Sequence, residues 1–192
     1  ILKMPFLKWV GYLSATSVYG DHNGNWVDET SSTNPGSKRG IERANAEKQW
    51  MSLNLPTHIF RLSGIYGPER NQINTIKNQT AIKIIKQDHT FSRIHVDDIV
   101  AALKLSMASP KPGIYNLADD QPSSSADLID FVCQELNLKQ PKGVLLEDAQ
   151  LSEMRRSFYK DHKKVSNQLM KKAYGWTPNY PDYKAGYKAL LK

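Results

Sequence analysis

The chain has 192 residues, 40% hydrophobic and 23% charged, which is enough for one substantial core and is not the composition of a disordered or collagen-like chain. Its single cysteine, Cys133, excludes an internal disulfide framework and a multi-cysteine metal site, and its apolar neighbours predict a buried thiol. No apolar segment approaches the roughly 20 residues of a membrane helix, and residues 1–13 do not resemble a signal peptide. We therefore expect a cytoplasmic protein.

The formal net charge of +7 comes from the C-terminal segment. Residues 151–192 contain 10 basic and 3 acidic residues, whereas residues 1–150 contain 16 of each. Such a segment can attract phosphates or nucleic acid. The simpler interpretation is a solvated helical surface, and we favour it because residues 163–172 lack the alternating aromatic and basic residues of a single-strand binder.

The first half of the chain predicts a strand, a loop, a helix and a second strand. Residues 9–13 predict the first strand, followed by a hydroxyl-rich turn that ends at Gly20. Residues 21–37 are rich in Asn, Asp, Gly, Ser and Pro and predict a loop. Residues 36–53 predict a helix, and residues 57–68 a second strand. The apolar positions of this helix are Ile41, Ala44, Trp50 and Met51.

The second half continues the alternation of strands and helices. Residues 94–108 predict a helix capped by Asp97, with Asp98 in its first turn. Its expected buried positions are Ile99, Leu103 and Met107. Residues 113–120 predict a strand, and residues 123–136 a helix. Ser124 and Asp127 have the spacing of a capping box. The chain from residue 151 predicts mostly helix, broken at Gly175, and the whole order predicts an α/β fold with a parallel sheet.

Six segments together resemble the extended short-chain dehydrogenase/reductase superfamily, and within it the NAD-dependent epimerase/dehydratase family. They are LSATSVYG, the Pro-x-Ser helix entry at residues 35–37, RLSGIYGPER, RIHVDDIV, YNLADDQP and NQLMKKAYGWTPNYPDYKAG. DHNGNW and FSRIHVDD are most similar to an atypical branch of that family, the YeeZ-like proteins.

The resemblance implies a Rossmann-like parallel sheet with flanking helices and a small, mostly helical C-terminal region on the substrate side. We expect one domain, 1–192. In it, residues 1–68 and 94–120 would be the remnant of the Rossmann core, and residues 69–93 and 121–192 the substrate-side and C-terminal helical segments. The chain resembles the family from its midpoint onward, so we expect a fragment or a truncated gene product that lacks the N-terminal half of the fold.

The family implies NAD or NADP as the cofactor of the complete protein. It holds the dinucleotide on a Gly-rich turn between the first strand and the first helix. No GxGxxG occurs in this sequence, so the alternative is that this chain alone binds no cofactor. The cofactor-binding positions that the resemblance assigns are Ser14, Ala15, Arg43, Leu62, Ser63 and Gly64.

The family's catalytic residues are a Tyr and a Lys four residues apart on this helix and a Ser or Thr at the end of the preceding strand. The Tyr position falls on Arg39, the Lys position on Arg43, and the hydroxyl position on Ala15, beside Ser14 and Thr16. Arg43 keeps a cation for a ribose, whereas a guanidinium cannot move a proton near neutral pH. We take Thr16, Arg39 and Arg43 as the candidate catalytic residues. The simpler interpretation is a solvated helix face with an Arg43–Glu47 pair.

Two residues are candidates for substrate binding, Tyr66 and Arg93. The alternative for Tyr66 is a packing residue at a strand end, and for Arg93 an ordinary surface arginine. Sugar-nucleotide members of the family carry an Asn where this chain has Gly64, which weakens a nucleotide-sugar assignment. His95, between a strand and a capped helix, is expected to be structural. The histidine spacing indicates no metal site.

Two functional hypotheses remain. The first is an NAD(P)-dependent epimerase/dehydratase-like oxidoreductase of the atypical type that acts, when complete, on a nucleotide-sugar-like or other small polar substrate. The alternative is a non-catalytic dinucleotide-binding scaffold or sensor, because all three catalytic positions are changed. The expected partners are a small-molecule substrate and, in a homodimer, a second copy. We do not expect a membrane or a nucleic-acid partner.

Overall fold

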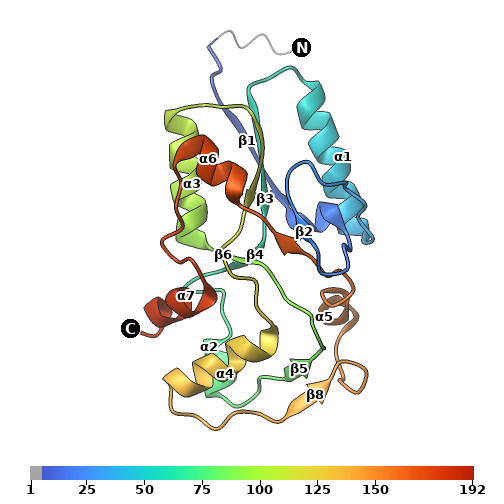
Figure 1. The fold of residues 1–192 in the computed structure, drawn as a ribbon, viewed down its shortest axis with the longest axis vertical. Helices are drawn as coiled ribbons and strands as arrows, with labels where there is room; N and C mark the ends of the chain where they lie inside the picture. The colour runs from blue at the N-terminus through green and yellow to red at the C-terminus, as the bar shows by residue number, and fades with distance from the viewer. Residues whose placement is uncertain (1–5) are drawn as a thin grey trace.

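The computed structural model describes residues 6–192 (Figure 1). Residues 1–5 lie outside the described residues. They are the first part of the predicted Rossmann-core range 1–68 and of the segment 1–13, which does not resemble a signal peptide. At the centre is a three-stranded parallel sheet in the order β1-β3-β7. Its strands are β1 (Val10–Ala15), β3 (Thr57–Leu62) and β7 (Gly113–Leu117). The predicted α/β fold with parallel strands and flanking helices is confirmed.

Helices cover both faces of this sheet. Helix α1 (Lys38–Ser52) lies on one side, and α3 (Val96–Ala108) and α6 (Gln168–Tyr174) lie on the other (Figure 1). Because it is covered on both faces, β3 is buried at every position. The core on the α3 and α6 side consists of Phe60, Leu62, Ile94, Ile99, Ala102, Tyr115, Leu117, Met170 and Trp176.

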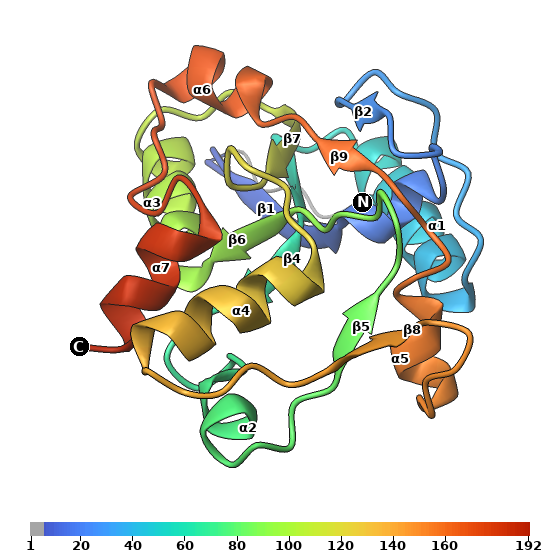
Figure 2. The same ribbon diagram turned by 60° about the horizontal axis from the view of Figure 1, so that its bottom comes forward.

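Three further helices form a second group below the sheet in Figure 1, and this group comes toward the viewer in Figure 2. The remaining strands form short parallel pairs. The helices of this group are α2 (Ile73–Lys77), α4 (Ser125–Glu135) and α7 (Tyr183–Leu190). The strand pairs are β2 (Trp26–Val27) with β9 (Lys164–Val165), β4 (Gly64–Tyr66) with β6 (Arg93–His95), and β5 (Lys83–Ile85) with β8 (Gly143–Leu145). The 3₁₀ helix η1 (Thr16–Tyr19) and α5 (Glu153–Ser157) complete the fold. None of the described helices combines the length and the apolar character needed to cross a membrane.

The strand predicted over residues 57–68 is wrong in its extent, because the chain leaves the central sheet at Ser63. The Ser63 N–H still donates to Leu117 O of the central sheet, at 3.0 Å. The next N–H, of Gly64, donates to Ser92 O at 3.1 Å and starts β4 beside β6. This change of sheet leaves the carboxyl end of β3 open. The first strand runs two residues further than predicted, to Ala15.

The predicted apolar face of α1 is also wrong. Ile41 and Met51 are 48% and 50% exposed. The buried positions are Gly40, Ala44 and Glu47, so only Ala44 of the predicted set is confirmed as buried. The helix therefore packs on the sheet through two small residues and one carboxylate. A carboxylate can occupy that face only because it has a buried partner.

Helix α3 begins two residues earlier than a cap at Asp97 would allow, so the predicted cap is wrong. His95 is the N-cap, and its Nδ1 accepts the Asp97 N–H at 3.2 Å. Met107 is 49% exposed, so its predicted burial is wrong, whereas that of Ile99 is confirmed. The Ser124–Asp127 capping box of α4 and the burial of Cys133 are confirmed. The pairing of β2 with β9 was not predicted.

Asp98 fixes the C-terminal segment to the start of α3. The fully buried carboxylate accepts the backbone N–H of Asn179 at 2.6 Å and that of Tyr180 at 3.1 Å. The Trp176 indole N–H donates to Asp98 O at 3.2 Å. The linker between α6 and α7 is thus held by one side chain.

We expect Asp98→Ala to lower the free energy of unfolding by about 3 kcal/mol, because two backbone donors lose their acceptor inside the protein. Asp97→Ala is the matched control, since this exposed neighbour in the same turn contributes only about 0.3–1 kcal/mol through the helix dipole. Urea denaturation followed by circular dichroism measures both. Equal losses for the two variants would contradict this role of Asp98.

Candidate functional site

A cleft of about 1300 Å³ lies at the carboxyl ends of β1 and β3. Ligands of open α/β sheets bind at this end of the strands. The cleft is lined by all ten residues that the sequence analysis assigned to the site: Ser14, Ala15, Thr16, Arg39, Arg43, Leu62, Ser63, Gly64, Tyr66 and Arg93. The structure therefore brings every predicted site residue to one place, while their individual roles remain predictions.

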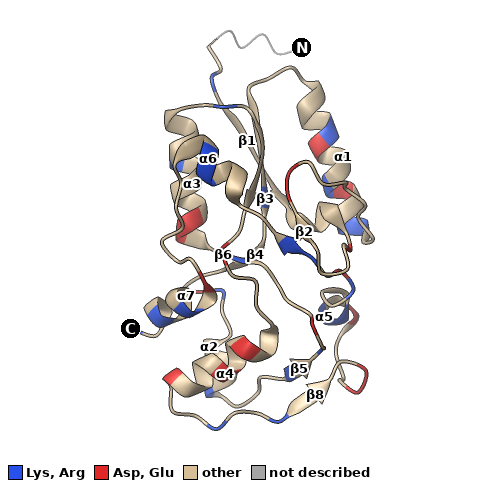
Figure 3. Cartoon of the chain, viewed as in Figure 1, with Lys and Arg blue, Asp and Glu red and all other residues tan. Residues whose placement is uncertain are grey.

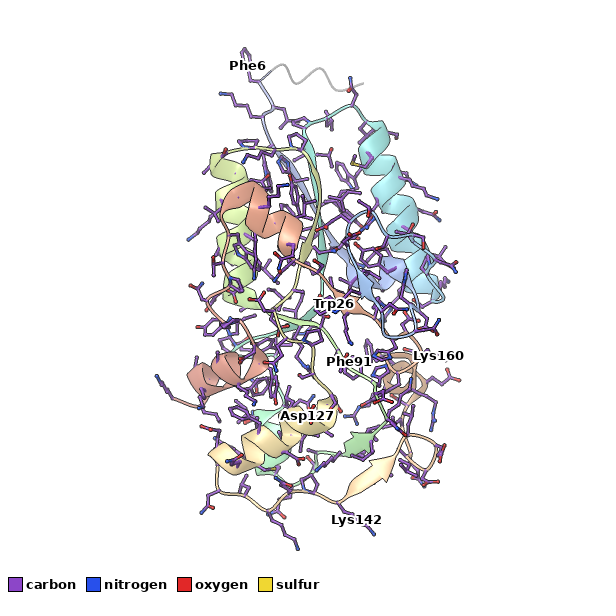
Figure 4. All side chains as sticks on the ribbon, in the orientation of Figure 1. Phe6, Trp26, Phe91, Asp127, Lys142 and Lys160 are labelled. Atoms are coloured by element: carbon purple, nitrogen blue, oxygen red, sulfur yellow. The ribbon has the colours of Figure 1, made fainter. Side chains whose placement is uncertain are left out.

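The far wall of the cleft is a segment from the C-terminal part of the chain. Residues 151–163 contribute Leu151, Met154, Arg155, Ser157, Phe158, Tyr159, Lys160, Asp161 and Lys163 to its lining. This segment packs on the chain just before β6, where the rings of Phe91 and Tyr159 meet edge to face at 5.3 Å. Figure 4 labels Phe91 and Lys160, which both line the cleft. The cleft is therefore bounded by the sheet and α1 on one side and by this segment on the other.

The start of α1 is brought close to the end of β1 by a cap and a glycine. Ser37 is the N-cap, and its Oγ accepts the Gly40 N–H at 3.1 Å. A Cβ added to Gly40 would lie 2.8 Å from Ser17 O, so only glycine allows the first turn of α1 to lie this close to η1. The first turn of α1 and the Thr16 segment consequently line the same cleft.

A buried ion pair fixes the inner face of α1 to the sheet. Glu47 of α1 and Arg61 of β3 are 5% and 4% exposed, and Arg61 Nη2 lies 2.7 Å from Glu47 Oε2. The Ser14 hydroxyl donates to Glu47 Oε1 at 2.6 Å. Glu47 therefore points into the protein, and the alternative of a surface Arg43–Glu47 pair is wrong. The Ser14 hydroxyl is also already used inside the protein.

The polar network continues across the sheet. Ser14, Arg61 and Asn116 are register partners on the three adjacent strands. The Tyr19 hydroxyl donates to Asn116 Oδ1 at 2.8 Å, and the Arg61 guanidinium lies 4.8 Å from the centre of the Tyr19 ring. Burial raises the pKa of Tyr19, although Arg61 acts in the opposite direction. Tyr19 is thus a buried packing residue with an ordinary structural hydrogen bond.

Arg39 and Arg43 occupy successive turns of α1 and line the cleft. Figure 3 shows the Lys and Arg positions along α1 in blue. Arg39 is exposed and Arg43 half-buried. Arg43 Nη1 donates to Leu13 O of the edge strand β1 at 3.0 Å. Neither guanidinium forms an ion pair within residues 6–192. Two cations with free donors therefore line the same cleft as Thr16, at the helix positions where the family pattern has a phenol and an amine.

Arg93 is a buried anchor. It is 8% exposed, so the surface-arginine alternative is wrong. Its Nη1 donates to Ser123 O at 3.0 Å and to Ser123 Oγ at 2.6 Å, and its Nη2 donates to Ser124 O at 3.2 Å. The side chain thereby holds the start of α4 against β6 and brings a positive charge to the wall of the cleft.

Tyr66 is buried beside Arg93, and its hydroxyl has no hydrogen-bond partner among the described residues. A Cβ added to Gly186 of α7 would lie 2.0 Å from this hydroxyl, so the ring packs directly on the α7 backbone. Burial raises the pKa of Tyr66, and the carboxylates of Asp119 and Asp98 raise it further. A phenol in this environment holds its proton.

Three charged residues that support the site from behind were not predicted to do so: Glu47, which was considered only for a surface pair, Arg61, and Asp119, whose backbone N–H donates to Arg93 O at 2.6 Å. Asp119 is 1% exposed, and neither carboxylate oxygen has a partner among the described residues. Burial raises the pKa of Asp119 to about 8, against the opposing influence of Arg93. A signal for Arg61 was present in the sequence, because an arginine inside the apolar strand THIFRL requires a buried partner.

The residues of the cleft suit one end of a nicotinamide dinucleotide. Ser63 is 6% exposed, and its Oγ is covered and has no partner among the described residues, so a rotation of this side chain would bring a free donor to a bound ligand. Arg43 keeps guanidinium donors beyond the one bound to Leu13 O, which suits a ribose hydroxyl. The pyrophosphate end would need a Gly-rich turn, a motif that the sequence does not contain.

No protein-family model matches the sequence, and no curated protein matches it. Solved structures do match. A conserved protein of unknown function from Silicibacter pomeroyi has 46% sequence identity and a TM-score of 0.93, with 96% of this chain and 66% of that chain covered. A putative NAD-dependent epimerase/dehydratase from Methylobacillus flagellatus has 26% identity and a TM-score of 0.73, with 96% and 63% covered.

The fold also matches an enzyme solved with its cofactor. The dTDP-glucose 4,6-dehydratase of Bacillus anthracis, in complex with NAD, has 18% identity and a TM-score of 0.75, with 94% of this chain and 60% of that chain covered. The chain thus spans about three fifths to two thirds of the length of these structures. Its fold is that of the NAD-dependent epimerases and dehydratases, which confirms the predicted superfamily at the level of the fold.

We expect Glu47→Ala to lower the free energy of unfolding by about 3–5 kcal/mol, because it leaves the Arg61 charge buried and uncompensated. Glu42→Ala is the matched control, a glutamate on the exposed side of the same helix, with an expected change within about 0.5 kcal/mol. Chemical denaturation of both variants gives the comparison. A loss of less than about 1 kcal/mol for Glu47→Ala would mean that the ion pair does not hold α1.

We expect Tyr66→Phe to leave the free energy of unfolding unchanged or to raise it by up to about 1 kcal/mol, because the variant removes a buried hydroxyl that has no partner. Tyr19→Phe is the control, since it removes a hydroxyl bonded to Asn116 and should cost about 1 kcal/mol. Thermal or urea unfolding measures both. A marked loss for Tyr66→Phe would show that its hydroxyl does have a partner in solution.

Proposed function

We propose that this chain is the C-terminal portion of an NAD(P)-dependent epimerase/dehydratase-like oxidoreductase of the atypical, YeeZ-like type. In this proposal the complete protein acts in the cytoplasm on a nucleotide-sugar-like or other small polar substrate. The single observation that supports it most is that ten residues assigned from the family pattern line one cleft at the carboxyl end of a Rossmann-like sheet. The likeness to structures that hold NAD supports the choice of cofactor.

In this proposal the residues of the cleft bind the cofactor and orient the substrate. Arg43 would bind the nicotinamide ribose, and Ser63 and the open backbone at Gly64 would contact the nicotinamide end. The Thr16 hydroxyl would orient the substrate. When bound, the cofactor supplies hydride transfer; this chain supplies binding, orientation and positive charge. The segments 69–93 and 121–192 would form the substrate side, although α6 from the second of them packs on the central core.

A second candidate is a dinucleotide-binding scaffold or sensor without chemistry. The observation that favours it is the pair of substitutions at Ala15 and Arg39, because neither side chain can donate and recover a proton near neutral pH. Tyr66, a phenol of the cleft lining, and Tyr19, at the end of η1, are both buried and have raised pKa values. The two candidates share the binding step and differ in turnover.

We expect the complete protein to bind NADH or NADPH. Arg43→Ala should weaken this binding about tenfold, because a charge-assisted hydrogen bond to the ribose is lost. Arg43→Lys should recover part of the affinity. Lys48→Ala, an exposed cation of the same helix that does not line the cleft, is the control and should bind as the parent does. Quenching of cofactor fluorescence gives the dissociation constants.

Turnover separates the two candidates. Conversion of any of a panel of nucleotide sugars and small polar alcohols to an oxidised, dehydrated or epimerised product supports the oxidoreductase, whether or not the cofactor shows a net oxidation or reduction. Tight cofactor binding with no turnover on the whole panel supports the scaffold. Absence of binding to both dinucleotides would contradict both candidates, and an unchanged affinity of Arg43→Ala would remove Arg43 from the cofactor site.

A further inference from the structure

The first turns of α1 carry charge of the sign that a helix N-terminus disfavours. The helix macrodipole places partial positive charge at this end, where acidic side chains stabilise a helix and basic ones do not. The first turn of α1 contains no acidic residue, and Lys38 and Arg39 occupy its first two positions. Arg43 follows one turn later. The chain therefore accumulates positive charge where its own backbone is already positive.

These charges are not neutralised within the described residues. Six ion pairs occur in residues 6–192, and none includes Arg39 or Arg43. The nearest acid on the inner face of the same helix, Glu47, is bound to Arg61 instead. The only acidic residue of α1 that lines the cleft is Glu42, which is exposed. The Arg39 guanidinium, and the donors of Arg43 beyond the one bound to Leu13 O, are thus available to bind an anion.

The opposite wall of the cleft is basic as well. Arg155 and Lys160 come from the segment that closes the cleft, and Arg70 comes from the turn after β4. The acidic residues of the lining are Glu42 and Asp161, and Asp161 lies 3.6 Å from Lys163. A cleft walled by cations from several elements attracts and concentrates anions.

A buried hydroxyl points to a ligand independently of these charges. Ser63 lines the same cleft, is 6% exposed, and its Oγ has no hydrogen-bond partner among the described residues. Buried polar groups in proteins nearly always have a partner. The Ser63 hydroxyl, which the proposed function gives to the nicotinamide end, therefore marks the cleft as a ligand site, and the anion itself is bound by the arginines.

We infer that Arg39 binds an oxyanion, a carboxylate or a phosphate, together with the guanidinium donors of Arg43 that Leu13 O and the ribose leave unused. The substrate of this cleft is then a small anion whose charged group lies at the start of α1. Side chains four residues apart on a helix are neighbours, and guanidinium groups bind carboxylates and phosphates through paired N–H donors. Arg39 would thus determine specificity at the position where the family pattern has its phenol. The inference rests on the proposed function, because it names the substrate class of the same site.

The test is an NMR titration of the protein at low ionic strength, without a dinucleotide. The probes are inorganic phosphate and malonate, with glycerol as the uncharged control. We expect millimolar binding of at least one anion, with shifts at the Arg39 and Arg43 side chains and at the Ser63 amide. Arg39→Gln and Arg43→Gln should each weaken binding about tenfold, a change expected when one charge-assisted contact is lost. The relative affinities of phosphate and malonate decide which oxyanion the site prefers.

Two matched variants separate a specific site from the general positive charge of the chain. Lys38→Gln removes an exposed cation from the same turn outside the cleft and should change the affinity less than twofold. Glu42→Gln removes the acid beside the two arginines and should tighten binding two- to fivefold. Equal weakening by Lys38→Gln and Arg39→Gln, or no binding of either anion, would overturn the inference. Anion binding by a protein that binds no dinucleotide would support the inference and contradict the proposed function.

Discussion

The structure depends on one buried ion pair, between Glu47 of α1 and Arg61 of β3. Two charges removed from water are tolerated only when each compensates the other, so this pair fixes which side of α1 faces the sheet. Ser14 of the neighbouring strand adds its hydroxyl to the same carboxylate. One interaction therefore joins the helix, the central strand and the edge strand. It leaves Arg39 and Arg43, on the first turns of the same helix, directed to the cleft.

The same constraint explains why the cleft is charged as it is. Because Glu47 is turned inward, the helix presents no acid to Arg43 on its inner side, and the surface pair that the spacing suggested does not form. Gly40 and the Ser37 cap then bring the first turn of α1 against η1. On the other side of the cleft, Arg93 holds α4 to β6. Packing interactions deep in the protein thus set the positions of the exposed cations.

The sequence was sufficient wherever the signal is local. The capping box of α4, the start of β7 and the α/β order depend on neighbouring residues and were predicted correctly, although β7 ends at Leu117 and not at residue 120 as predicted. The apolar face of α1 could not be predicted, because Glu47 is buried only through Arg61, fourteen residues away. The division of residues 57–68 into two strands depends on β6 and β7, which come later in the chain. Residues 14–16 and 62–64 lie together because they are at the ends of adjacent parallel strands. The burial of Arg93 could not be predicted, because it depends on the carbonyl groups of Ser123 and Ser124, which are distant in the sequence.

Hydrogen–deuterium exchange with and without NADH tests the central claim most directly, namely that these residues form one ligand site. The account predicts slower exchange at residues 14–16, 40–43 and 62–64 when the cofactor is added, with α4 and α7 unchanged. A uniform change over the whole chain, or slowing confined to segments away from this cleft, would contradict it.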